Sequence, residues 1–296
     1  MKLQLKLKDK HYLMLFLLPA IICLAVLSVY PLLFSLKNSF FNWDLIKPGS
    51  QENFIGFKNY IAILKDDAFW VALWITLKYT FFSVSAALVF GMAMAFLFFR
   101  NLFGTWVVRT IVIAAMVISP VIVGTLWRLM YSPDYGLVNY IIGLVGIPPQ
   151  SFLANTNSVL ASLILVDVWE FAPLIMVIIL AALQGLPSAI YEAGLIDGCN
   201  KMQLFLHITL PLLKPSILLS LLIRTMDCFR TFDSIYAMTG GGPGTSSQNL
   251  NILMFNTGFE FFQISKVTAM AVLSLVVITI ICLLMVKSLR KDSSLW

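Results

Sequence analysis

The sequence predicts an all-α, polytopic membrane protein with six transmembrane helices. Its 296 residues are 60% hydrophobic and only 11% charged, whereas soluble domains carry about 25% charged residues. A membrane-spanning helix needs about 20 mostly apolar residues, and runs of that length occur at about 12–36, 71–99, 109–131, 159–183, 214–235 and 267–288. The composition therefore excludes an ordinary soluble domain, and the length leaves no room for a large domain outside the membrane.

The first apolar run follows a short N-terminal segment, residues 1–11, which we expect in the cytoplasm. The run extends from Tyr12 to Leu36 and contains Pro19 and Pro31. A cleavable signal peptide has a shorter apolar region that ends in small residues. We therefore expect this run to be retained as the first span of a transmembrane domain covering residues 12–296.

The distribution of Lys and Arg predicts the orientation. With six spans, one side of the membrane receives the N-terminus, two connections and the C-terminal tail. That side holds Lys2, Lys6, Lys8, Lys10, Arg100, Arg109, Lys201, Lys214, Lys287, Arg290 and Lys291. The opposite side holds Lys37, Lys47, Lys58 and Lys65, diluted by Asp44, Glu52, Asp66 and Asp67. Because basic residues gather on the cytoplasmic side, both termini are predicted to be cytoplasmic.

The first outer segment, from Asn38 to Trp70, contains a candidate short helix between Phe57 and Leu64. Two interpretations remain open: an interfacial helix with its apolar side on the membrane, or an ordinary connecting helix. The segments 132–158 and 237–263 are rich in Gly and Pro. Both are predicted to be outer loops.

The connection between the fourth and fifth runs, residues 186–215, is predicted to be a folded element. Pro187 suits a first helical position, a helix can extend from Ser188 to Asp197, and Gly198 can end it in a left-handed cap. A second short helix is expected from Lys201 to His207, ending before Pro211, and Pro215 would open the fifth span. Such an element suits a partner's groove; the alternative is an amphipathic loop on lipid headgroups.

Charged residues occur inside two of the predicted spans, where charges are expensive and usually face a cavity or a partner. The fourth run carries Asp167 and Glu170 beside Trp169. The fifth carries Arg224, Asp227, Arg230 and Asp233 at intervals of three with alternating sign. Neighbours at i,i+3 meet on a helix, so the pattern predicts ion pairs between Arg224 and Asp227 and between Arg230 and Asp233. Arg224, Asp227, Cys228 and Thr231 would form one patch.

The 186–215 segment carries a specific resemblance. Glu192-Ala193-Gly194, Asp197-Gly198, Ile208, Leu210-Pro211 and Pro215 resemble the EAA loop of permease subunits of binding-protein-dependent ABC importers. The family pattern has two alanines after the glutamate, so Gly194 departs from it by one methyl group. Further matches point to the carbohydrate-uptake, maltose-permease-like branch. These are Gly56-Phe57-Lys58-Asn59-Tyr60, Trp169, Pro173, Phe232-Asp233-Ser234-Ile235-Tyr236 and Thr239-Gly240-Gly241-Gly242-Pro243.

The resemblance implies a type I ABC importer permease fold in the cytoplasmic (inner) membrane of a prokaryote. It implies transport of a sugar or related carbohydrate, without enzymatic activity in this chain. The implied partners are a second homologous permease subunit, two cytoplasmic ATPase subunits that bind ATP and Mg, and an extracytoplasmic solute-binding protein. Coupling to the ATPase would use Glu192, Ala193, Gly194, Asp197 and Gly198. The implied substrate path is Asp167, Trp169, Glu170, Phe171, Leu174, Arg224, Asp227, Cys228 and Thr231.

Other functions fit the residues less well. No G-x-x-x-x-G-K-[ST] motif occurs, so the chain is not expected to bind its own ATP. The sequence also has no H-E-x-x-H or G-x-S-x-G motif, and Cys23, Cys199, Cys228 and Cys282 lack metal-ligand spacing. No catalytic residue, metal site or cofactor is therefore predicted. An ion-coupled secondary transporter or channel is the alternative, since intramembrane Asp, Glu and Arg also suit ion coupling.

Overall fold

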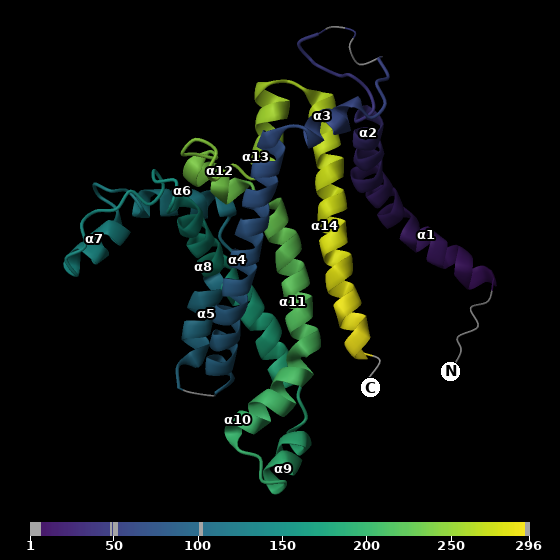
Figure 1. The fold of residues 1–296 in the computed structure, drawn as a ribbon. Coiled ribbons are helices and arrows are strands. Elements are labelled where there is room, and N and C mark those ends of the chain that lie inside the picture. Colours follow the sequence, from purple (N-terminus) through teal and green to yellow (C-terminus); the bar gives the residue numbers. More distant parts are fainter. Residues whose placement is uncertain (1–6, 48, 50–52, 101–102, 294–296) are drawn as a thin grey trace. The chain divides into compact units, whose positions relative to one another are not determined.

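The computed structural model describes residues 7–47, 49, 53–100 and 103–293 (Figure 1). Lys2, Lys6 and Glu52, which the orientation prediction used, lie outside this part. The regular secondary structure of the described residues is helical apart from one isolated antiparallel bridge between Phe41 and Phe54. The helices are α1 (Leu7–Leu24), α2 (Tyr30–Asn38), α3 (Lys58–Leu64), α4 (Asp67–Phe99), α5 (Thr105–Ala115), α6 (Pro120–Met130), α7 (Leu137–Leu144), α8 (Val159–Gln184), α9 (Ser188–Ile196), α10 (Lys201–Leu204), α11 (Leu210–Arg230), α12 (Asp233–Thr239), α13 (Leu250–Phe255) and α14 (Ile264–Ser293), with π-helical turns at Ala25–Val29, Phe205–Thr209 and Asn256–Glu260.

Five helices in the described ranges are long and apolar enough to cross a membrane: Phe16–Asn38, Asp67–Phe99, Val159–Gln184, Lys201–Arg230 and Ile264–Lys287. A sixth crossing exists if the pair α5 and α6 is counted as one span. The all-α, polytopic fold class is therefore confirmed. The chain divides into two compact units, one comprising residues up to Asp67 with Met254–Val276, the other Ala68–Leu253 with the residues from Val277 onward.

In the first unit, the segment after α2 is joined to the start of α14 by paired hydrogen bonds. The Trp43 amide donates to the Ser265 hydroxyl (2.6 Å), and the Ser265 amide donates to the Trp43 carbonyl (3.1 Å). Lys266 also pairs with Asp66, with 2.9 Å between Nζ and Oδ2. The connection between the first and second predicted spans is thus attached to the first turn of α14, which forms the last predicted span.

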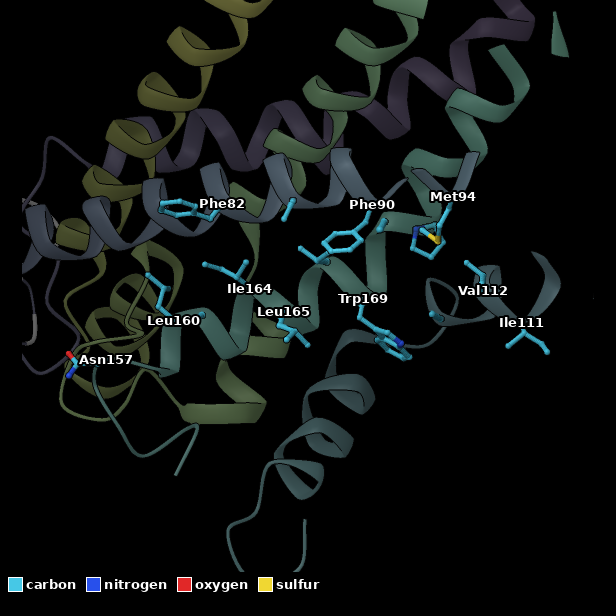
Figure 2. A pocket seen from close by; sticks show the side chains of 16 residues that line it. Phe82, Phe90, Met94, Ile111, Val112, Asn157, Leu160, Ile164, Leu165 and Trp169 are labelled. Atoms are coloured by element: carbon cyan, nitrogen blue, oxygen red, sulfur yellow. The ribbon is translucent and has the colours of Figure 1, made fainter. Parts of the chain in front are cut away.

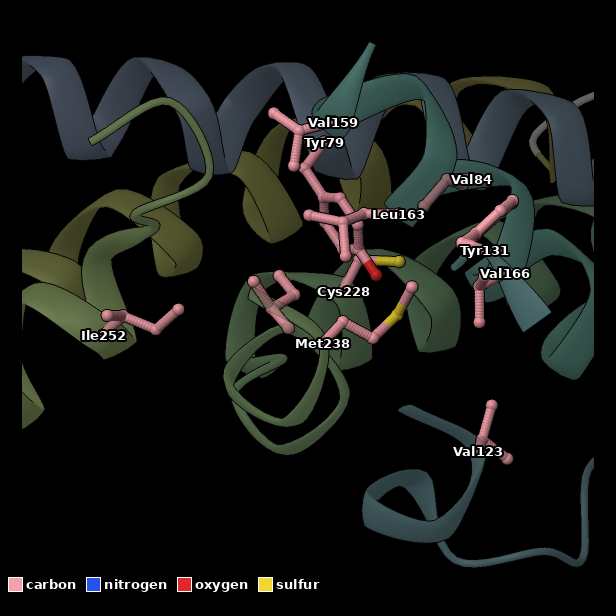
Figure 3. Packing of buried hydrophobic residues seen from close by; sticks show 11 residues of the cluster. Tyr79, Val84, Val123, Tyr131, Val159, Leu163, Val166, Cys228, Met238 and Ile252 are labelled. Atoms are coloured by element: carbon pink, nitrogen blue, oxygen red, sulfur yellow. The ribbon is translucent and has the colours of Figure 1, made fainter. Parts of the chain in front are cut away.

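In the second unit, α4 and α8 approach closely at Gly91. A Cβ atom built there would lie 2.7 Å from Cβ of Ile175 and 2.8 Å from the Ala172 carbonyl oxygen, so only glycine fits. A separate cluster of buried side chains packs the same helices together; it includes Tyr79 of α4, Leu163 and Val166 of α8 and Cys228 of α11 (Figure 3). These three helices position the polar side chains described below.

The third predicted span, residues 109–131, is not one straight helix. α5 ends at Ala115, α6 begins at Pro120, and the two are bent by 96°. Pro120 lacks an N–H, and Ser119 before it has the extended backbone (ψ 134°) that a following proline favours. Composition alone did not reveal this break, since the residues around it are apolar enough to pass as a continuous span.

The fifth predicted span, residues 214–235, is wrong at both ends. The second short helix does not stop before Pro211, because one continuous helix extends from Lys201 to Arg230. The π-helical turn Phe205–Thr209, in which the Leu210 amide bonds to the Phe205 carbonyl, precedes Pro211. At the other end α11 stops at Arg230, and α12 begins at Asp233 and packs on α6. Gly124 permits this contact, since a Cβ there would lie 2.8 Å from the Ser234 carbonyl oxygen.

Candidate functional site

Four side chains from α8 and α11 form a buried polar cluster: Asp167, Glu170, Arg224 and Cys228. Nη2 of Arg224 lies 2.7 Å from Oδ2 of Asp167 and 3.1 Å from Sγ of Cys228. The Arg224 side chain is only 1% exposed. Because a buried charge requires a partner, this ion pair holds the two helices together at the middle of the predicted spans.

Asp227 connects the cluster to the surface. Its carboxylate lies 3.8 Å from Nη1 of Arg224 on one side and 3.2 Å from Nη2 of Arg230 on the other. The Asp227 side chain is 39% exposed, and Arg230 is exposed. Asp227 therefore presents a negative charge beside a fixed buried cation.

This geometry corrects part of the predicted pairing. Arg224 does contact Asp227, but its short ion pair is with Asp167 of a different helix. Arg230 pairs with Asp227 instead of Asp233. The reason is the end of α11: Thr231 has an extended backbone (φ −57°, ψ 124°), so Asp233 no longer follows Arg230 at helical i+3 spacing.

Three further residues of the predicted path, Phe171, Leu174 and Thr231, lie around the buried polar cluster. The guanidinium of Arg224 lies over the Phe171 ring, 4.2 Å from its centroid, and this cation–π arrangement fixes the ring. Leu174, three residues further along α8, is partly buried. The Thr231 hydroxyl donates to the Asp227 carbonyl at the end of α11 (3.2 Å). Oε1 of the buried Glu170 side chain has no hydrogen-bond partner within the described residues.

Trp169 does not belong to this group. Successive residues are about 100° apart around a helix, so Trp169 faces away from Asp167. It lines an apolar cavity of about 970 Å³ between α4, α5 and α8, together with residues such as Phe90 and Leu165 (Figure 2). Its ring packs edge-on against Trp127, with 5.5 Å between centroids. Sequence adjacency grouped Trp169 with the acidic residues; helical periodicity separates them.

Tyr79 of α4 is a member of the site that sequence reasoning missed. It is buried and lies close to Asp167, and its hydroxyl points toward Cys228 (Figure 3). The available signal was the spacing of Thr76, Tyr79, Thr80 and Ser83 at i, i+3, i+4 and i+7 in a mostly apolar run. Such a stripe shows that one side of this helix carries polar groups, but not which other helix they meet.

The 186–215 loop has the predicted first helix and its cap. Gly198 has φ +81°, a left-handed conformation, and the Cys199 amide bonds back to the Gly194 carbonyl (2.9 Å). α10 then begins with a reciprocal capping box between Asn200 and Gln203. Glu192, Ala193 and Asp197 are exposed, as are the large apolar side chains Leu195, Ile196 and Met202.

Gly194 is the one buried residue of α9. A Cβ atom built on it would lie 2.7 Å from Cδ2 of Leu204 and 2.9 Å from Cδ1 of Ile208. The Tyr191 and Thr209 hydroxyls are hydrogen bonded nearby (3.0 Å). The loop therefore folds back on itself through a small-residue contact, which fixes the direction of the exposed apolar tip.

Comparison with known proteins decides which family this architecture represents. The family described as the binding-protein-dependent transport system inner membrane component matches residues 87–292. The chain belongs to this family. It is therefore a permease, the membrane-spanning transport subunit of an ABC importer and not an enzyme. The ion-coupled secondary transporter considered above is thereby set aside.

Relatives agree over most of the chain. A probable ABC transporter permease protein, y4oQ of Sinorhizobium fredii, is 39% identical over 85% of this chain and 81% of its own. The trehalose/maltose transport system permease protein MalF of Thermococcus litoralis is 37% identical over 70% of each chain. The trehalose transport system permease protein SugA of Mycobacterium tuberculosis is 31% identical over 91% of this chain and 85% of its own.

Solved structures share the fold. A bacterial ABC transporter involved in the import of the acidic polysaccharide alginate contains a chain with a TM-score of 0.83 at 24% identity, covering 96% of both chains. A chain of the MetNI methionine ABC transporter has a TM-score of 0.56 at 19% identity, covering 77% of this chain and 99% of its own. The ABC importer permease fold expected from the resemblance is confirmed.

Proposed function

We propose that this permease forms half of the path for a sugar or related carbohydrate, opposite a second homologous permease subunit. An extracytoplasmic solute-binding protein would deliver the sugar, and two cytoplasmic ATPase subunits would drive transport. Relatives named for trehalose, maltose and sulfoquinovosyl glycerol support the substrate class. A structure of the alginate transporter in complex with a periplasmic protein supports the binding-protein partner.

The observation that carries the proposal is the division of the site into a buried and an accessible part. Arg224 and Asp167 are paired and buried, so they act as positioning residues. Asp227, Phe171, Leu174 and Thr231 are only partly buried around them. A carboxylate accepts charge-assisted hydrogen bonds from sugar hydroxyls, while an aromatic ring covers an apolar sugar face. A free phosphate is a poorer match, since Arg224 already has a carboxylate partner.

Coupling to ATP hydrolysis is assigned to the 186–215 loop. Its exposed Leu195, Ile196 and Met202 side chains suit an apolar groove on the ATPase subunit. Glu192 and Asp197 add negative charge at the same tip. ATP and Mg would be bound by the ATPase subunit. The 186–215 loop of this chain would dock on that subunit and move with it.

The proposed orientation places both termini and the 186–215 loop in the cytoplasm, with the 132–158 and 237–263 loops outside. The bias of Lys and Arg supports it. A reporter fused after Trp296 should therefore score as cytoplasmic. An external score would overturn the orientation without affecting the family assignment.

The path is tested by removing the accessible carboxylate. In proteoliposomes that contain the complete transporter, with ATP inside and the loaded binding protein outside, Asp227→Ala should reduce sugar uptake at least tenfold while ATPase association stays intact. The matched control is Asp233→Ala, because Asp233 is also exposed but lies on α12. Normal uptake by Asp227→Ala, or equal loss in both variants, would reject the assigned site.

A further inference from the structure

Two polar side chains of the Gly56–Tyr60 motif, Asn59 and Tyr60, form a clasp with the end of α2. Nδ2 of Asn59 donates to the carbonyl oxygens of Ser39 (2.8 Å) and Phe41 (2.9 Å). The Tyr60 hydroxyl is hydrogen bonded to the Ser39 hydroxyl at 2.6 Å. Asn59 and Tyr60 thus attach α3 to the end of α2, and these hydrogen bonds are made within the chain.

A second face of α3, which starts at its N-cap residue Phe57, is apolar and exposed. Phe57 is 67% exposed and Ile61 52%, and Leu64 is exposed at the next turn. Their spacing of i, i+4 and i+7 forms one stripe. Lys58 and Lys65, which are also exposed, lie about 90° around the helix from this stripe. A stripe of large apolar side chains flanked by lysines is typical of a helix lying in a membrane interface.

The position of α3 in the chain places it at the membrane surface. α2, the end of the first span, stops at Asn38, and the next span begins at Asp67. Asp66 and Trp43 are also tied to Lys266 and Ser265 in the first turn of the α14 span. The clasped segment is therefore held at the ends of three spans, within reach of the boundary between headgroups and acyl chains.

We propose that α3 lies in the lipid interface, with Phe57, Ile61 and Leu64 inserted among the acyl chains and Lys58 and Lys65 at the level of the phosphates. The occupant of the exposed face is the bilayer itself. The helix would fix the height of the α2 and α4 span ends in the membrane. This placement is independent of the proposed sugar path, and it holds for whichever side of the membrane α3 occupies.

Spin-label accessibility tests the placement. Ile61→Cys and Ala62→Cys are each introduced into a chain in which Cys23, Cys199 and Cys282 are replaced by serine or alanine, while Cys228 is kept because it is buried and out of reach of the label. The complete transporter is labelled and placed in nanodiscs of phosphatidylethanolamine and phosphatidylglycerol. Ala62 is a matched control, since it is exposed on the same helix but about 100° away from Ile61. Collision with dissolved oxygen, which concentrates in lipid, is compared with collision with a water-soluble nickel chelate.

The expected result is that the label at 61 collides more often with oxygen than with nickel, while the label at 62 shows the reverse preference. Leu64→Cys should follow Ile61. A label at 61 that reports nickel would place the stripe in water and overturn the proposal. A label that reports neither reagent would show that a protein partner covers the stripe, which also overturns it. Sugar uptake by the same labelled transporter, reconstituted in proteoliposomes, shows separately whether the sugar-path proposal stands.

Discussion

The buried polar cluster and the 186–215 loop invert the usual distribution of side chains. In the membrane-spanning helices, Arg224 and Asp167 are buried and paired. In the loop, Leu195, Ile196 and Met202 are exposed, Ile196 by 85%. A buried charge that has an ion-pair partner is stabilised within this chain. Exposed large apolar side chains, in contrast, mark a surface that another molecule covers. The two regions therefore differ in what stabilises them: the cluster is paired by its own helices, whereas the exposed apolar tip of the loop is left for the partner proposed above.

The largest effect is expected from breaking the buried pair. Asp167→Leu leaves the Arg224 guanidinium buried without its 2.7 Å partner, which should cost about 3–5 kcal/mol. Thermal unfolding of the purified transporter in detergent would measure the loss. Asp167→Leu combined with Arg224→Met should recover most of the stability, because an apolar pair of similar volume avoids the uncompensated charge. Failure of the double variant to recover would mean that Tyr79 or Cys228 also requires the ions.

The sequence predicted this pair only in part, for a physical reason. Hydropathy and three-residue spacing identified Arg224 and Asp167 as charges at membrane depth. Spacing, however, reports only neighbours on one helix, so it predicted the Asp227 contact and missed the shorter contact with Asp167. Which faces of α8 and α11 meet is decided by packing between helices, and Gly91 shows how a single small residue sets such a contact.

The loop was more predictable, because its signals are local. Pro187, Gly198 and the polar residues after it specify caps through their own backbone preferences, and α9 ends within a residue of the expected position. The mispredicted stop before Pro211 has the opposite origin. A proline usually ends a helix, but here Pro211 lies in the first turn of α11, directly after a π-helical turn.

A change of intermediate size is expected at Gly198. Nothing lies within 4 Å of a Cβ atom built there, so any cost comes from φ +81° and not from a clash. Gly198→Val should cost roughly 1–2 kcal/mol locally and redirect α10, while the spans stay folded. Co-purification of the ATPase and ATP hydrolysis stimulated by the binding protein would measure the uncoupling.

Gly198→Asn provides the control for that variant, because asparagine tolerates the left-handed conformation better than a β-branched residue. It should retain most of the coupling. If valine were tolerated as well as asparagine, the cap would not set the direction of the loop. The comparison between a self-contained cluster and a partner-dependent loop would then lose its structural basis.

The smallest effect is expected from Gly194→Ala, which restores the second alanine of the family pattern. Alanine raises helix propensity by about 1 kcal/mol relative to glycine. The new methyl group would meet Leu204 and Ile208, but only at the far ends of their side chains, which can rotate aside. The net change in unfolding free energy should therefore stay within about 1 kcal/mol, with ATPase association and uptake close to those of the unmodified chain. Gly194→Leu cannot be accommodated in this way, and it should separate α9 from α10 and weaken ATPase association. Equal behaviour of the two variants in the co-purification assay would show that the buried contact at Gly194 does not hold the loop in its docking shape.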